Sequence, residues 1–307
     1  MRAREAIAGR LHRTPTFTSA SLSERSGAQV HLKAELFQRT GSFKPRGVLN
    51  KLASLSDSEK RRGVIGISAG NHAQALAYCA ALEGVDALLV MWEGASPQKI
   101  EATQAYGAKV DLEADGPAQA FDRLHELMEE TGRPLVHPFD DPRTIAGQGT
   151  VGLEIIEDVP ETAVLLVPVG GGGLVAGIAL AADGRRIVAV EPELSDALRR
   201  GLEAGESVRV EPKSMADGLS APFAGEYAIR ICGQHDVECV LVTEDEIAEG
   251  MRFLYGRAKL ACEPAAAVGV AALLAGKVAV QPHETVAVVV SGGNVTTEIA
   301  SAILGSE

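Results

Sequence analysis

The twelve residues from Thr40 to Lys51, TGSFKPRGVLNK, place a lysine directly after an aromatic residue and before a proline. Lys44 follows Phe43 at the junction of a predicted turn and a predicted helix that runs to about Ser54. An amine that is shielded by an aromatic ring loses hydration in its charged form, and this favours the neutral form. A neutral amine can condense with a carbonyl group to form a Schiff base. Lys44 is therefore a candidate catalytic lysine, the alternative being an ordinary lysine at a helix start.

Composition and charge restrict the class of protein. The chain has 307 residues, 46% apolar and 23% charged, enough for two modest globular domains or one large one. Its net charge of -12 argues against a nucleic acid or anionic membrane partner, because both need basic patches. The uncharged stretch 162–182 contains a proline and four consecutive glycines, which favours a buried strand, loop and helix over a membrane span. Scattered cysteines without metal or redox spacing favour a reducing, cytoplasmic location: Cys79, Cys232, Cys239 and Cys262.

Apolar strands alternate with helical segments along most of the chain, which is typical of parallel sheets with crossover helices. Helix starts are predicted at Ser96-Pro97, with serine as N-cap, and at the capping box 243–246, whose helix runs to about Leu260. Another helix is expected near residues 142–157. The expected strands are VHLKAEL (30–36), GVIGIS (63–68), DALLVMW (86–92), AKVDLE (108–113), PLVHP (134–138), AVLLVPV (163–169), RRIVAVE (185–191) and TVAVVV (285–290).

Gly170, Gly171, Gly172 and Gly173, followed by Leu174, connect a predicted strand to a predicted helix. Consecutive glycines let backbone N–H groups turn toward a phosphate, and the helix N-terminus adds partial positive charge. A purely structural turn seldom needs four glycines, because each is costly in chain entropy. Residues 171–176 also fit G-x-G-x-x-A, with Glu191 about 20 residues further on, as in a nicotinamide dinucleotide site. That alternative, an NAD-dependent oxidoreductase, leaves the lysine segment unexplained.

Two further loops lie between a predicted strand and a predicted helix. The first, Ser68-Ala69-Gly70-Asn71-His72, has small residues that expose N–H groups at a helix start, which suits a substrate carboxylate. The second is 291–294, Ser-Gly-Gly-Asn. In both loops the asparagine can also be an ordinary helix cap. His72 can likewise be a helix-end histidine, and we assign it no catalytic role.

These segments together resemble the fold-type II pyridoxal phosphate enzymes, most closely the threonine/serine dehydratases and serine racemases. The resemblance also includes Lys33–Gln38, KAELFQ, and extends from about His12 to Asn294 with the motifs in the family's order. It implies an α/β, two-domain, tryptophan synthase β-like fold with parallel-rich twisted sheets flanked by helices. The implied domains are a large cofactor-anchoring one, residues 1-60 and 142-307, and a small inserted α/β domain, residues 61-141.

The resemblance also implies roles for individual residues. Lys44 would carry pyridoxal 5'-phosphate as a Schiff base and act as the catalytic base. Asn71 would meet the ring hydroxyl and Ser291 the pyridine nitrogen, while the glycine run would bind the phosphate. The implied cofactor-binding residues are Phe43, Lys44, Asn71, Gly170, Gly171, Gly172, Gly173, Leu174, Gly218, Glu263 and Ser291. The implied substrate-binding residues are Ser68, Ala69, Gly70, Asn71 and His72.

The implied reaction is β-elimination of water from a small β-hydroxy amino acid such as L-threonine or L-serine, giving a 2-oxo acid and ammonia. Racemases of this family carry at position 69 a serine that transfers a proton, which Ala69 cannot do. The uncharged hydroxyl of Ser291 would make the cofactor ring a weaker electron sink, which also favours elimination. Serine racemases, hydroxyaspartate or phenylserine lyases and a non-catalytic binding protein remain alternatives.

The resemblance gives only partial support for a cation site and for a partner subunit. Glu191 aligns with a divalent-cation ligand of the racemase branch and Ser195 with its carbonyl ligand. The second carboxylate of that site is Ala197 here, with Asp196 one residue away. A mono- or divalent cation is thus expected only if other groups complete the site. The expected partners are an amino-acid substrate and, by family habit, a second copy in a homodimer, with neither nucleic acid nor membrane.

Overall fold

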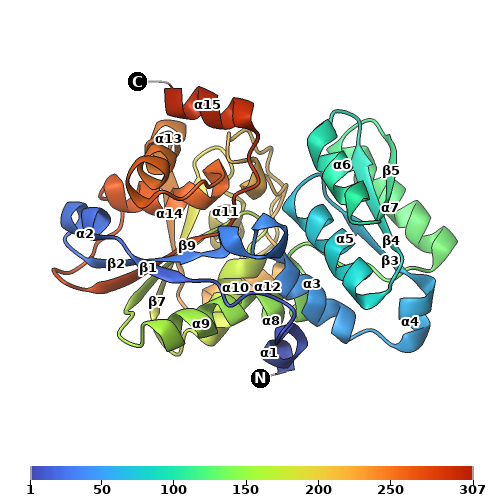
Figure 1. The fold of residues 1–307 in the computed structure, drawn as a ribbon, viewed down its shortest axis with the longest axis horizontal. Coiled ribbons are helices and arrows are strands. Elements are labelled where there is room, and N and C mark those ends of the chain that lie inside the picture. Colours follow the sequence, from blue (N-terminus) through green and yellow to red (C-terminus); the bar gives the residue numbers. More distant parts are fainter. Residues whose placement is uncertain (1, 306–307) are drawn as a thin grey trace. The chain divides into compact units, whose positions relative to one another are not determined.

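The computed structural model describes residues 2–305, so the outer ends of the predicted large domain, residues 1 and 306–307, lie outside the described residues (Figure 1). The chain divides into two compact units. The first consists of Met1–Leu11 and Lys44–Gly147, and the second of His12–Phe43 and Gln148–Glu307. The chain therefore passes from one unit to the other between Phe43 and Lys44.

The first unit contains a parallel three-stranded sheet with helices on both faces. Side chains of the middle strand alternate, because successive residues of a strand point to opposite faces. Leu89 and Met91 join a buried cluster with Leu49 and Leu76, whereas Val90 packs in a second cluster. In spatial order the strands are β3 (Val64–Ile67), β4 (Ala87–Trp92) and β5 (Lys109–Ala114). The helices are α1 (Arg2–Ile7), α3 (Lys44–Ala53), α4 (Asp57–Arg62), α5 (Asn71–Glu83), α6 (Pro97–Ala105), α7 (Pro117–Thr131) and α8 (Pro142–Gln148).

The second unit contains a six-stranded sheet in the order β1-β2-β9-β6-β7-β8. Only the pairing of β1 with β2 is antiparallel; the other neighbours in this sheet are parallel. The carboxyl ends of parallel strands lie at the same edge of a sheet, so the loops after β6 and β9 share that edge. The strands are β1 (Thr16–Thr18), β2 (Gln29–Ala34), β6 (Val164–Pro168), β7 (Arg186–Pro192), β8 (Glu238–Val242) and β9 (Thr285–Val290).

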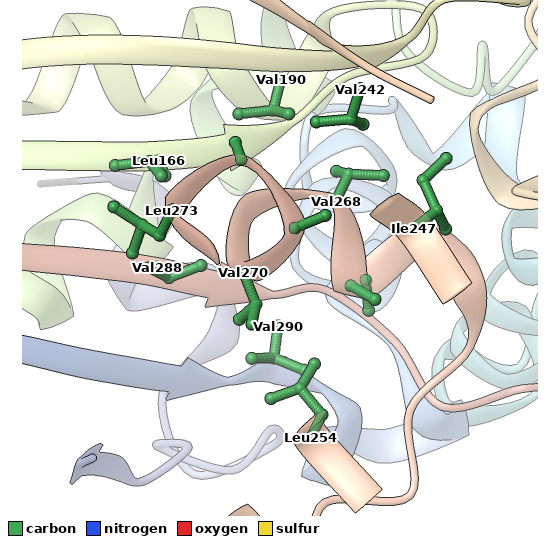
Figure 2. Packing of buried hydrophobic residues seen from close by; sticks show 14 of the residues in the cluster. Leu166, Val190, Val242, Ile247, Leu254, Val268, Val270, Leu273, Val288 and Val290 are labelled. Carbon is green, nitrogen blue, oxygen red and sulfur yellow. The ribbon is translucent and has the colours of Figure 1, made fainter. Parts of the chain in front are cut away.

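Helix α14 (Pro264–Leu274) lies buried against this sheet, as Figure 2 shows. Its Val268, Val270 and Leu273 belong to one apolar cluster with strand residues Leu166 and Val288. A helix that is apolar all round must be covered on both sides. The other helices of this unit are α2 (Ala20–Ser26), α9 (Thr150–Asp158), α10 (Gly173–Ala181), α11 (Ala197–Ala204), α12 (Glu226–Gln234), α13 (Glu244–Phe253) and α15 (Thr297–Gly305).

Most predicted elements are present, and the differences concern where single elements begin, break or end. The capping box at the start of α13 forms with both of its hydrogen bonds. The helix expected over 142–157 is divided at Gly149 into α8 and α9, and the helix from Thr243 changes at Leu254 into a π-helical turn ending at Ala258. Ser96 occupies the N-cap of α6 but makes no side-chain cap hydrogen bond. The strand expected at 134–138 is reduced to one bridge, between Leu135 and Ile65.

The apolar stretch 162–182 forms strand β6, the glycine turn and helix α10, as its proline and glycines predicted. Within residues 2–305, no helix is both long and apolar enough to cross a membrane.

The two compact units do not follow the predicted domain limits at every point. Residues 44–60 were expected in the large domain, but α3 packs on α5 through Leu49 and Leu52, which share a cluster with Ala75. The segment before Lys44 instead pairs with the second unit through a bridge between Ser42 and Gly292. The first unit therefore extends beyond residues 61–141 on both sides.

Helix α13 lies close to α14 because Gly250 lacks a side chain. A Cβ at this position would stand 2.8 Å from the carbonyl oxygen of Ala267 and 3.0 Å from the amide nitrogen of Ala271. We predict that Gly250→Ala lowers the free energy of unfolding by about 1–3 kcal/mol, because backbone atoms cannot move aside individually. Gly256→Ala, where the new methyl group meets nothing within 4 Å, should not destabilise the protein. Urea unfolding of both variants checks this, and equal stabilities would contradict it.

Candidate active site

Lys44 is the first residue of α3, and its amine lies beside a loop of the same unit. Nζ donates a hydrogen bond to the carbonyl oxygen of Pro138 at 3.0 Å. The parallel bridge of Leu135 to Ile65 aligns the loop with β3. The loop then continues toward the carboxyl end of β3, where Ser68 lies. The structure thus brings the predicted lysine to the end of the strand that carries the predicted substrate loop.

The loop Ser68–His72 turns sharply into α5. Ser68 Oγ accepts from the N–H of Gly70 at 3.1 Å, and Gly70, not Asn71, occupies the N-cap position. The first helical hydrogen bond runs from Ala73 to the carbonyl oxygen of Gly70, so the amides of Asn71 and His72 come before it. A Cβ on Gly70 would meet nothing within 4 Å, which leaves open space at this helix start. This geometry suits a bound carboxylate, although the role of each residue remains a prediction.

His72 is buried and neutral. Its Nε2 lies 2.8 Å from the carbonyl oxygen of Val136 and therefore donates to it. Burial, together with the charge of Lys44, lowers the pKa of His72 to about 3. Its Nδ1 has no hydrogen-bond partner within the described part of the chain. Nε2 is thus engaged with the main chain, and the group that His72 offers at the start of α5 is its backbone amide.

His137 and Pro138 were not among the predicted site residues. Burial lowers the pKa of His137 to about 4, and the charges of Lys44 and Lys51 act in the same direction. Its Nδ1 accepts from the N–H groups of Phe139 and Asp140, at 3.3 and 2.8 Å. Both residues end the predicted strand PLVHP. Residues at the carboxyl ends of parallel strands commonly form binding sites, so this position could have indicated them from the sequence.

In the second unit, the glycine run leads from β6 into α10. Gly172 has φ 87°, a left-handed conformation that favours glycine, and a Cβ there would lie 2.5 Å from that of Ala228. The first helical hydrogen bond of α10 runs from Ala176 to the carbonyl oxygen of Gly172. The amides of Gly173 and Leu174 therefore precede the helical ladder and are available at a helix N-terminus. This is the arrangement that a phosphate group requires.

Glu263, another predicted cofactor residue of this unit, is buried. The side chain of Glu263 lies against Gly218 and against Gly292, where a Cβ would collide with Oε1. Its N–H donates to the carbonyl oxygen of Gly292 at 3.1 Å. The adjacent Ser291 accepts, through its carbonyl oxygen, from the N–H of Phe43 at 3.1 Å. Leu219, which follows Gly218, lies within 3.1 Å of the position that a Cβ on Gly170 would take.

Two buried hydroxyl groups just before the lysine have no hydrogen-bond partner within the described residues. They are Thr40 Oγ1 and Ser42 Oγ. Thr40 also has φ 60°, which is strained for a β-branched residue. Its carbonyl oxygen accepts from Nδ2 of Asn294 at 2.7 Å. Strain and unpaired polar atoms tend to gather at functional sites, and a polar ligand would give these hydroxyls partners.

Glu191 is fully buried at the end of β7 and acts as a cap for α11. Its oxygens accept from the N–H groups of Leu198 and Arg199, at 2.8 and 2.9 Å. Burial raises the pKa of Glu191 to about 7. A nicotinamide dinucleotide site would need this carboxylate to bind a ribose. Because both of its oxygens already accept main-chain hydrogen bonds, the structure argues against such a site. Asp196 forms ion pairs with Arg199 and Arg200, and its charge adds to the rise in the pKa of Glu191.

No group of three or more histidine, cysteine, aspartate or glutamate side chains in the described residues could hold a metal ion. The neighbours of Glu191 thus give the predicted cation site no further support, and it stays a prediction.

Comparison with known proteins gives the class to which this arrangement belongs. The family model described as pyridoxal-phosphate dependent enzymes matches residues 7–292. The chain belongs to this family, which confirms the predicted fold class and makes pyridoxal phosphate its cofactor.

Individual relatives cover nearly the whole chain. The sequence is 42% identical to an L-threonine ammonia-lyase of Thermotoga maritima, over 96% of this chain and 74% of that protein. It is 41% identical to the catabolic L-threonine dehydratase of Escherichia coli K12, over 99% of this chain and 94% of that one. The structure of maize serine racemase superposes with a TM-score of 0.92 at 35% identity, over 96% of this chain and 92% of that chain.

The residues present fit the cofactor. Pyridoxal phosphate needs an amine for its aldehyde, N–H donors for its phosphate and a partner for its ring nitrogen. Lys44 would supply the amine, the glycine run from Gly170 with Leu174 the donors, and Ser291 the partner. The two unpaired hydroxyls described above fit a site that receives a polar group. When bound, the cofactor supplies the electron sink that makes the α-proton of an amino acid acidic.

The buried neutral His72 should make stability depend on pH. Its folded-state pKa of about 3 is below the ordinary 6.5, so the unfolded chain binds the proton first. His72 should therefore contribute a fall of about 1.4 kcal/mol per unit in the free energy of unfolding as pH drops from about 6 to about 4, in addition to the contribution of His137. His72→Gln keeps a donor for Val136 and does not titrate, so its slope should be smaller by that amount. Urea unfolding across this range measures both slopes, and identical slopes would exclude a neutral His72.

Proposed function

We propose that this protein is a pyridoxal-phosphate-dependent ammonia-lyase that removes water from L-threonine or L-serine, giving a 2-oxo acid and ammonia. The observation that carries the proposal is the amine of Lys44, held at Pro138 beside the end of β3 in a chain of this family. The relatives named above support the substrate class, since two of them are described as acting on L-threonine.

Within this proposal the chain's own residues bind the substrate carboxylate, hold the cofactor phosphate and move a proton. The amides of Asn71 and His72, with Ser68 and Gly70, hold the substrate carboxylate at the start of α5. Lys44 would hold the cofactor through its amine and, when that amine is free, would take the α-proton of the substrate as general base. Loss of the β-hydroxyl then needs a proton, which the same lysine can return. The Gly170–Gly173 run would hold the cofactor phosphate and so help to orient the substrate.

Position 69 favours elimination over racemisation. A racemase needs a second group that protonates the α-carbon from the face opposite the lysine. The methyl group of Ala69 cannot exchange a proton. The neutral side chain of Ser291 adds to this preference, because a carboxylate opposite the ring nitrogen would stabilise a carbanion for longer. Racemase activity is nevertheless a candidate second function, supported by the close structural similarity to maize serine racemase.

The side chains that select the substrate are not assigned, so lyases acting on hydroxyaspartate or phenylserine remain alternatives of the same class. A panel of hydroxy amino acids, assayed for 2-oxo acid and ammonia, distinguishes them. We further propose a homodimer in a reducing compartment, supported by family habit and by four cysteines with free thiols.

Removing the amine of Lys44 should abolish both cofactor attachment and turnover. We predict that borohydride treatment of the purified protein bleaches its visible absorbance and leaves a reduced adduct on Lys44. Lys44→Ala should lose activity by at least about a thousandfold. Lys109→Ala, an exposed lysine of the same unit, serves as the control and should behave as the wild type. An adduct on another lysine, or full ammonia release by Lys44→Ala, would contradict the proposal.

A hydroxyl at position 69 should restore a second proton-transfer group. We predict that Ala69→Ser raises the ratio of serine racemisation to elimination by about tenfold or more. Ala69→Gly, which changes size without adding a hydroxyl, is the matched control and should leave the ratio unchanged. Chiral chromatography of serine, combined with a 2-oxo acid assay, measures both rates. The same ratio in both variants would show that position 69 does not decide the outcome.

A further inference from the structure

The segment 134–141, which we name the histidine loop, is fixed at both ends within the first unit. At its start, Ile65 donates to the carbonyl oxygen of Pro134, and Val136 donates back to Ile65, at 3.1 and 2.9 Å. At its end, Asp141 accepts from the amine of Lys51 at 2.6 Å. Its backbone positions are thus held by hydrogen bonds that do not involve Lys44.

Between these ends, His137 shapes the backbone around Pro138. Nδ1 of His137 accepts from the N–H groups of Phe139 and Asp140, so the main chain folds back over the imidazole. The carbonyl oxygen of His137 accepts in turn from Oγ1 of Thr144 at 3.3 Å. The peptide unit between these anchors is that of Pro138, whose carbonyl oxygen consequently has a fixed direction. That oxygen is the acceptor for Nζ of Lys44.

We propose that His137 is a positioning residue for Lys44: by holding the Pro138 carbonyl, it orients the lysine amine whenever that amine is not bonded to the cofactor. The inference rests on the proposed function of Lys44 and deepens it. One N–H of the amine is committed to Pro138, so the directions of its lone pair and remaining hydrogens are restricted. An amine so restrained loses less orientational freedom when it meets the cofactor aldehyde or the α-proton.

The arrangement requires His137 to be neutral. A protonated imidazole carries hydrogen on both nitrogens and could not accept at Nδ1. Two cationic groups face this ring, Lys44 and Lys51, and two anionic ones, Asp140 and Asp141. Burial and the two lysines oppose protonation, and they outweigh the aspartates. With its pKa lowered to about 4, the imidazole is neutral at neutral pH, and the loop keeps its shape there.

The test compares two substitutions of His137, one that places a side-chain amide oxygen at the position of Nδ1 and one that places it further from the backbone. The Oδ1 atom of His137→Asn can stand where Nδ1 stood and accept from the same N–H groups, whereas His137→Gln reaches past them. In cofactor-free protein, a limiting amount of an acetylating reagent should label Lys44 about fivefold faster in His137→Gln than in wild type, as expected for one lost hydrogen bond. In His137→Asn and in Pro138→Ala, which keeps the carbonyl, the rate should stay within about twofold. Lys277, in the other unit, provides the internal reference.

A second readout is the rate at which added pyridoxal phosphate produces the visible absorbance of bound cofactor. It should fall about fivefold in His137→Gln and little in His137→Asn. If His137→Gln does not fold, His137→Leu replaces it with the same expectation. Equal labelling of Lys44 in the asparagine and the glutamine or leucine variants would overturn the inference. Mapping of the borohydride adduct on wild-type protein stays independent, so failure of the proposed function is recognised separately.

Discussion

The placement of Lys44 depends on how the chain is fixed on either side of one peptide bond, that between Phe43 and Lys44. On one side, the N–H of Phe43 donates to the carbonyl oxygen of Ser291, at the end of β9. On the other, Lys44 opens α3 and its amine donates to Pro138. Each compact unit thus holds its own side of the junction through main-chain groups. The candidate lysine is thus held on both sides by main-chain carbonyl groups, those of Ser291 and Pro138.

Close approach of backbone segments organises the second unit in the same way. Glu263 fills the space that a side chain at Gly292 would occupy, Ala265 blocks the same space at Gly218, and the backbone of Leu219 lies close to Gly170. Glycine at these points costs chain entropy. The cost is offset because the segments can then pack closely. The Ser291 loop and the segment around Gly218 both lie against Glu263, and Leu219 brings the latter segment to the glycine run at Gly170.

Electrostatics in the first unit follow from burial. A lysine next to two ionised imidazoles would be strongly disfavoured, yet His72 and His137 both lie beside Lys44. Desolvation keeps both rings neutral, and each then uses a single nitrogen for a main-chain hydrogen bond. Both histidines thus fix main-chain groups near the lysine through hydrogen bonds and add no charge beside it. Their neutrality is consistent with the proposed role of Lys44 as the group that exchanges protons with the substrate.

The sequence alone determined the fold class, most of the strands and helices, and the segments proposed for the site, because these depend on local patterns. Apolar runs define strands, the capping box defines the start of α13, and the glycines after β6 and the lysine after Phe43 are readable along the chain. Only the tertiary structure showed the Pro138 carbonyl and the two neutral histidines. Carbonyl groups carry no sequence signature, and the protonation of a histidine depends on burial and on charges from distant segments. The grouping of α3 with the first unit was decided in the same way, since it depends on which apolar faces meet.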